Sequence, residues 1–175
     1  MSEDLKKIFL HKFHKKNFAK FVSFAGYSMP INYKDGIIKE HLQVRNSVGL
    51  FDVSHMGQIL IPCNNENIEI LLKYIPIDLK KINFFKSFFS FLLNKEGGII
   101  DDIIISKILY QNTEYFFIVY NASRRKEDEA LFTSNLSKYI LLKNNSLLAI
   151  QGPKSEKVLD FLNFSNDFLF MNCNT

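Results

Sequence analysis

The 175-residue chain has few cysteines, no long apolar run and little excess charge. Its two cysteines, Cys63 and Cys173, are too few for a disulfide framework and suit a reducing compartment. No run of about 20 apolar residues occurs, so we expect no membrane-spanning helix and no membrane partner. The formal charge is +4, from 22 basic and 18 acidic residues. That excess is too small to indicate a nucleic-acid-binding surface.

A targeting signal is also missing. The chain begins Met-Ser-Glu-Asp, without a basic leader followed by an apolar core. We therefore expect a cytoplasmic protein if the source is bacterial. A protein of the mitochondrial matrix would need a presequence that has already been removed.

Metal- and nucleotide-binding motifs are absent from the sequence. The histidines form no HxxxH or HxH pair near a carboxylate, and no CxxC, Walker sequence or GxGxxG occurs. We expect no metal site. His11 and His14 lie one helical turn apart, a spacing more typical of a surface pair than of a ligand pair.

The chain does have enough apolar material for a core, because 47% of its residues are hydrophobic and 14% are aromatic. Strands separated by turns alternate with helices, which favours an α+β fold with a largely antiparallel sheet and flanking helices. Periodicity predicts helices over residues 3–16, 35–48, 64–75, 123–140 and 154–162, and extended segments over 18–33, 50–62, 86–93, 99–109, 115–120 and 146–150. The expected helix caps are Asp35, Asn64 or Asn65, and Ser123, and the last strand is expected to be buried.

Two adjacent carboxylates, Asp101 and Asp102, interrupt a run of isoleucines. Neighbours in a strand point to opposite faces, so one of the two can face inward. An inward carboxylate needs a partner and commonly has a perturbed pKa, as functional groups do. The alternative is an acidic hairpin shoulder with both groups in water.

Asp52, Ser54 and His55 lie within four residues and invite comparison with a catalytic triad. Triad members normally come from separate segments, and in an extended chain His55 points away from Asp52 and Ser54. We therefore favour a buried turn whose polar groups bond to backbone over nucleophilic catalysis.

Five segments, in this order, resemble the amino-terminal part of the glycine cleavage system T-protein family, the aminomethyltransferases. The resemblance runs from about residue 8 to the end, and the FDVSHMG and GGIIDD blocks are its most specific parts. The segments are FAGYSMPINY at 24–33, VRNSVGLFDVSHMG at 44–57, NKEGGIIDDIII at 94–105, VYNASRRKED at 119–128 and LLAIQGPKS at 147–155.

The resemblance implies an enzyme that uses tetrahydrofolate as acceptor. Such an enzyme takes the aminomethyl group from the lipoyl arm of H-protein, releases ammonia and forms 5,10-methylene-tetrahydrofolate. Asp102 matches the family's essential aspartate, which implies that it faces inward, into a dry pocket, with Asp101 outside. Asn121 matches a folate-contacting asparagine, and Met56 matches a residue lining the same cavity.

Two positions depart from the family pattern, and the chain is short. Phe89 stands where the family usually has a pterin-contacting tyrosine, and Ser106 stands where tyrosine is frequent. T-proteins have three domains around a central folate site and are about twice as long. The resemblance therefore implies that residues 1–175 are the amino-terminal folate-binding region, with the later domains absent.

Three alternatives to the aminomethyltransferase stay open. They are a related folate-dependent demethylase or iron–sulfur assembly factor, a non-catalytic folate-binding or interaction fragment, and a plain structural domain. We expect Asp102→Asn to fold normally with a large loss of turnover, and Asp101→Asn to lose much less.

Overall fold

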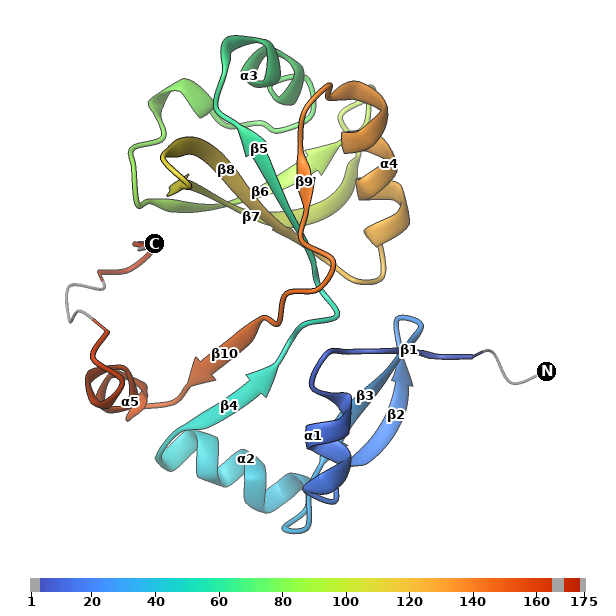
Figure 1. The fold of residues 1–175 in the computed structure, drawn as a ribbon, viewed down its shortest axis with the longest axis vertical. Coiled ribbons are helices and arrows are strands. Elements are labelled where there is room, and N and C mark those ends of the chain that lie inside the picture. The colour runs from blue at the N-terminus through green and yellow to red at the C-terminus, as the bar shows by residue number, and fades with distance from the viewer. Residues whose placement is uncertain (1–3, 165–168, 174–175) are drawn as a thin grey trace. The chain divides into compact units, whose positions relative to one another are not determined.

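The computed structural model describes residues 4–164 and 169–173 of the chain (Figure 1). The chain divides into two compact units, Met1–His55 with Asn144–Asp167, and Met56–Lys143 with Phe168–Thr175. Every described strand pairing is antiparallel except that of β1 with β3. The predicted α+β class with largely antiparallel sheets is therefore confirmed.

The second unit is built on a five-stranded sheet in the order β6-β7-β8-β5-β9 (Figure 1). Its strands are β5 (Gly57–Pro62), β6 (Ser87–Leu93), β7 (Ile99–Tyr110), β8 (Thr113–Tyr120) and β9 (Ile140–Leu141). A turn over residues 94–98, between the two extended segments predicted at 86–93 and 99–109, joins β6 to β7: Asn94 Oδ1 accepts from the backbone N–H of Glu96 and Gly98, and Gly97 has φ +79°. That left-handed conformation suits glycine, which has no Cβ to clash.

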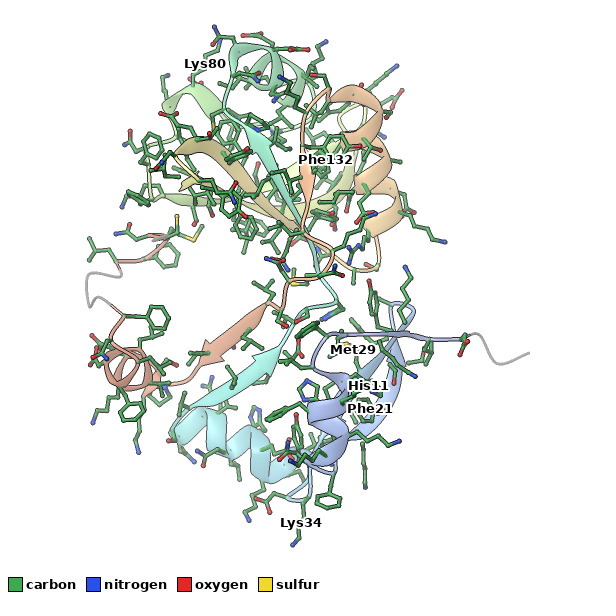
Figure 2. All side chains as sticks on the ribbon, viewed as in Figure 1. His11, Phe21, Met29, Lys34, Lys80 and Phe132 are labelled. Atoms are coloured by element: carbon green, nitrogen blue, oxygen red, sulfur yellow. The ribbon has the colours of Figure 1, made fainter. Side chains whose placement is uncertain are left out.

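One face of this sheet carries the main hydrophobic core. The helices α3 (Asn65–Leu71) and α4 (Arg125–Asn135) pack on it, and Phe132 of α4 is fully buried (Figure 2). Asn64 caps α3 as predicted, because its side chain accepts from the backbone N–H of Asn67. A 3₁₀ turn, η1 (Leu79–Lys81), adds the buried Leu79 to the same core.

Two small sheets and three helices make up the described residues of the first unit. The three-stranded sheet has the order β1-β3-β2, and β4 pairs antiparallel with β10. Figure 2 shows His11 of α1 beside Phe21 of β2, with the two rings stacked at 4.4 Å between centroids. The elements are β1 (Lys6–Lys7), α1 (His11–Lys16), β2 (Lys20–Phe24), β3 (Tyr27–Asn32), α2 (Ile37–Asn46), β4 (Gly49–Asp52), β10 (Leu148–Gln151) and α5 (Ser155–Phe161).

Several predicted boundaries are wrong because tertiary pairing outweighs local propensity. Residues 3–16 do not form one helix, since Lys6 and Lys7 pair with β3 and α1 begins only at His11. The helix predicted over 123–140 ends at Asn135, and Ile140 joins the sheet edge as part of β9.

Two predicted caps and one predicted burial also fail. Gly36, not Asp35, occupies the N-cap of α2, and Arg124, not Ser123, occupies that of α4. The strand predicted over 146–150 is β10, but it forms a two-stranded ribbon with Leu148 exposed. Near the end of the chain, residues 169–173 are described, and Asn172 bridges to Lys86.

Candidate functional site

Asp101 and Asp102 lie near the start of β7 and point to opposite faces of the sheet. Asp101 is 7% exposed and pairs in register with the fully buried Leu92, whereas Asp102 is exposed and pairs with Phe91. The expectation that Asp102 is the inner carboxylate, in a dry pocket, and Asp101 the outer one is therefore wrong. The reason is that Asp101 lies on the face of the sheet that the helices cover.

Asn121 links the two carboxylates. It directly follows β8, the strand beside β7. Its backbone N–H donates to Asp101 Oδ2 at 2.8 Å, and its side-chain Nδ2 donates to Asp101 Oδ1 at 2.9 Å. The same Nδ2 lies 3.0 Å from Asp102 Oδ1 and 3.2 Å from the Asp102 carbonyl oxygen. The structure thus brings together two residues that the sequence predicted for one site, Asp102 and Asn121.

A third carboxyl group, that of Asp128 on α4, completes the cluster. It has no exposed surface, and its carboxyl group interacts with that of Asp101. Burial, reinforced by the neighbouring Asp101, raises the pKa of Asp128 to about 8. Sequence reasoning missed this residue, although Asp128 and Phe132 are four residues apart and so share a helix face.

Phe89 lies on the same face of the sheet as Asp102. Phe91 is the register partner of Asp102, and Phe89 is two residues before it on β6. The rings of Phe89 and Phe91 meet edge to face at 5.4 Å between centroids, and Phe89 is 56% exposed. A carboxylate with two aromatic rings beside it can bind a flat ring that carries N–H groups.

The other two positions singled out from the sequence lie near this face. Met56 is half-buried and precedes Gly57, which pairs with Tyr120, so Met56 and Asn121 extend neighbouring strands at the same end. Ser106 is four residues after Asp102 on β7, and it is buried with its hydroxyl 2.7 Å from that of Ser87.

Asp52, Ser54 and His55 do not form a triad. Asp52 Oδ2 lies 2.8 Å from Nε2 of His14, and its Oδ1 accepts from the Ser54 backbone N–H. The Ser54 hydroxyl contacts the backbone of Leu147, as expected of a structural turn. Burial lowers the pKa of His55, whose ring packs edge-on against Phe24.

The expectation that His14 lies at the surface is wrong. His14 is 5% exposed, and its Nδ1 lies 2.6 Å from the Tyr33 hydroxyl. A pocket of about 380 Å³ lies beside His14, Tyr33 and Asp52. These polar groups are bonded to one another, as expected of buried polar side chains.

Within residues 4–164 and 169–173, no group of three or more His, Cys, Asp or Glu side chains could hold a metal ion. Burial raises the pKa of the Cys63 thiol to about 12, so this cysteine is a poor nucleophile. No helix in the described part of the chain is long and apolar enough to cross a membrane.

Comparison with known proteins identifies the relatives of this chain. The GCVT N-terminal domain family matches residues 10–175. The aminomethyltransferase of Thermoanaerobacter pseudethanolicus is 37% identical over 169 residues, which are 94% of this chain and 45% of the relative. The mitochondrial aminomethyltransferase of Dictyostelium discoideum is 36% identical, over 90% of this chain and 41% of its own length.

A solved structure agrees with these matches. The glycine cleavage system aminomethyltransferase T from Bartonella henselae superposes on this chain with a TM-score of 0.87 and 36% sequence identity. The superposition covers 98% of this chain and 47% of the Bartonella chain. The chain thus spans about half the length of these relatives. The match over residues 10–175 shows that this chain belongs to the GCVT N-terminal domain family, the amino-terminal part of the aminomethyltransferases.

Proposed function

We propose that this chain is the amino-terminal folate-binding region of a glycine cleavage aminomethyltransferase and carries its key carboxylate, Asp102. In this proposal the longer protein transfers a one-carbon unit from the aminomethyl-lipoyl arm of H-protein to tetrahydrofolate. Ammonia, 5,10-methylene-tetrahydrofolate and the lipoyl arm with its sulfur released as a thiol are the products. The names of the relatives support the reaction class, and a bacterial cytoplasm or a mitochondrial matrix is the corresponding compartment.

The observation that carries the proposal is that Asp102 is exposed yet held in place. Its Oδ1 lies 3.0 Å from the Asn121 amide nitrogen, which Asp101 also binds. A carboxylate fixed before the reaction costs little reorganisation when charge develops beside it. Asp102 would accept a hydrogen bond from the attacking folate nitrogen and stabilise its growing positive charge. Two folate nitrogens, N5 and N10, would form bonds to the transferred carbon as its bonds to nitrogen and sulfur break, so that ammonia leaves and the lipoyl sulfur leaves as a thiol.

The surroundings of Asp102 fit a reduced pterin. Phe89 and Phe91 supply aromatic surface on the same face, against which a flat ring can pack. Phe89 has no hydroxyl, so any contribution it makes to pterin binding is packing alone. Met56 directly precedes β5, at the same end of the sheet as Asn121, and would border the same ligand.

The exposure of Asp102 favours one alternative, a folate-binding or interaction fragment without catalysis. Water around an exposed carboxylate weakens its electrostatic effect on a reacting group. Binding tetrahydrofolate needs less electrostatic stabilisation than transfer does. The two functions therefore differ in turnover rather than in binding.

Two measurements test the proposal. Titration of the 175-residue chain with tetrahydrofolate should show saturable binding, and its absence would contradict a folate-binding region. A chimera in which this chain replaces the matching part of the Thermoanaerobacter relative should release ammonia from aminomethyl-lipoyl H-protein, faster with tetrahydrofolate present. Folate binding together with an inactive, folded chimera would favour the non-catalytic alternative.

Asp102→Asn in the chimera should lower kcat by roughly 100-fold, because it removes one preorganised charged group. Glu96→Gln is the matched control, since Glu96 is an exposed acid in the turn before β7. Asp101→Asn does not serve as a control, because Asp101 accepts both Asn121 N–H bonds and is buried. Equal activity of Asp102→Asn and wild type would remove Asp102 from the reaction.

A further inference from the structure

Asp128 is a buried acid to which the proposed mechanism assigns no role. It lies on α4 with no exposed surface, although α4 is otherwise a polar helix. Within the described residues, no N–H or O–H group donates to either of its side-chain oxygens. Its interaction partner is the carboxyl group of Asp101 on β7.

Two carboxyl groups attract each other only when one of them carries a proton. Asp101 already accepts from the backbone and side-chain N–H groups of Asn121, one on each oxygen, so Asp101 is the acceptor of the pair. Asp128 receives no donor and is fully buried, so the proton belongs on Asp128. The raised pKa of Asp128 agrees with this assignment.

Asp101 in turn fixes the group that holds Asp102. Both Asn121 N–H bonds to Asp101 restrain the backbone and the amide plane of Asn121. That same amide lies 3.0 Å from Asp102 Oδ1 on the open face of the sheet. The side chains thus form a continuous series from the helix-covered face, Asp128 to Asp101 to Asn121, that ends at Asp102.

We propose that Asp128 is a positioning residue, which as a protonated acid donates to Asp101 and so sets the Asn121 amide that orients Asp102. The catalytic consequence rests on the proposed function, but the hydrogen-bonded series does not. A neutral donor at position 128 is the feature that this arrangement requires.

Loss of the proton would place two negative charges side by side in the core. The other charged or titratable groups near Asp128 are Arg124 and Glu127 at the start of α4 and the buried Tyr120 on β8. The nearby Glu127 opposes ionisation of Asp128, whereas Arg124 favours it. We expect Asp101 and the Asn121 amide to shift when Asp128 ionises, near pH 8.

The first test is independent of activity. The side-chain amide signals of Asn121 in the ¹⁵N-labelled 175-residue chain should move between pH 6 and pH 10, with a midpoint near 8. Asp128→Asn keeps a neutral donor and should abolish this titration without displacing the signals far. Glu127→Gln, an exposed acid on the same helix, is the matched control and should still titrate. Static Asn121 signals in the wild-type chain, or an unchanged titration in Asp128→Asn, would overturn the proposal.

The second test reads the consequence for turnover in the chimera described above. Asp128→Leu, which has no donor, should lower kcat roughly tenfold with little change in KM for tetrahydrofolate, because it misorients a held carboxylate. Asp128→Asn should restore kcat and remove the alkaline decline centred near pH 8. An Asp128→Leu chimera with wild-type kcat would show that position 128 does not act on Asp102. If every chimera is inactive, the amide titration still decides whether Asp128 orients Asn121.

Discussion

Single side chains in this protein have environments set by the strand face on which they lie. Asp101 and Asp102 are chemically identical neighbours, yet one is buried against α4 and the other faces outward beside Phe91. Alternation in the strand made the separation predictable. Which face the helices cover was not predictable from the run of isoleucines, because apolar residues occupy both faces of β7.

Packing leaves no room for a side chain at Gly57. A Cβ added there would lie 1.9 Å from the ring of Tyr120, which is fully buried and cannot move aside. Gly57→Ala should therefore destabilise the protein by about 3 kcal/mol or more through overpacking. Urea unfolding followed by circular dichroism measures this, because the chain has no tryptophan. Gly98→Ala, which meets only the flexible Asn94 side chain at 3.0 Å, should lose less; equal losses would contradict the packing argument.

His14 is the hydrogen-bond partner of a buried acid. The side chains of His14 and Asp52 are 6% and 1% exposed, and their bond is 2.8 Å long. His14→Leu leaves the Asp52 carboxylate without this partner and should cost about 3–5 kcal/mol of unfolding free energy. His41→Leu, on the exposed face of α2, is the control and should change stability by less than about 0.5 kcal/mol. Similar values for the two variants would show that the His14–Asp52 pair contributes little.

At the scale of elements, α3 depends on its cap. Asn64 Oδ1 accepts from the Asn67 backbone N–H at 2.8 Å, which satisfies one of the free donors at the helix start. Asn64→Ala should lower the unfolding free energy by about 1 kcal/mol, whereas Asn64→Asp should keep the cap. Thermal unfolding of both variants measures the difference. A loss in Asn64→Asp as large as in Asn64→Ala would show that the cap bond is not the cause.

The elements that sequence predicted well are those specified by short-range chemistry. The turn at residues 94–98 needs an asparagine acceptor and a glycine at positive φ, and both are written in the sequence. The elements predicted poorly depend on distant partners. Lys6 and Lys7 form a strand because their backbone pairs with β3. Ile140 belongs to a strand, not to the helix before it, because its backbone pairs with β5.

At the scale of the whole molecule, Asp128 makes stability depend on pH. Its pKa is about 8 in the folded chain and about 3.9 in the unfolded chain. Between these values the folded state holds a proton that the unfolded state has released. Stability should therefore fall as pH rises from 4 to 8, by at most about 1.4 kcal/mol per pH unit from this group, and level off above pH 8.

Urea titrations of the 175-residue chain at a series of pH values measure this dependence. Asp128→Asn, which cannot ionise, should flatten it over the same range. Glu127→Gln is the control that leaves Asp128 in place. A pH dependence unchanged by Asp128→Asn would mean that Asp128 is ionised in the folded state.

The sequence by itself determined the class of fold, the family and the presence of Asp102 and Asn121 as a pair, because periodicity, turn chemistry and motif order are local properties of the chain. Only the tertiary structure decided which aspartate is buried, that His14 hydrogen-bonds to Asp52, and that Asp128 interacts with Asp101. Burial and ionisation depend on what packs against a side chain. Asp101 is 27 residues away from Asp128 along the chain, and Asp52 is 38 residues away from His14.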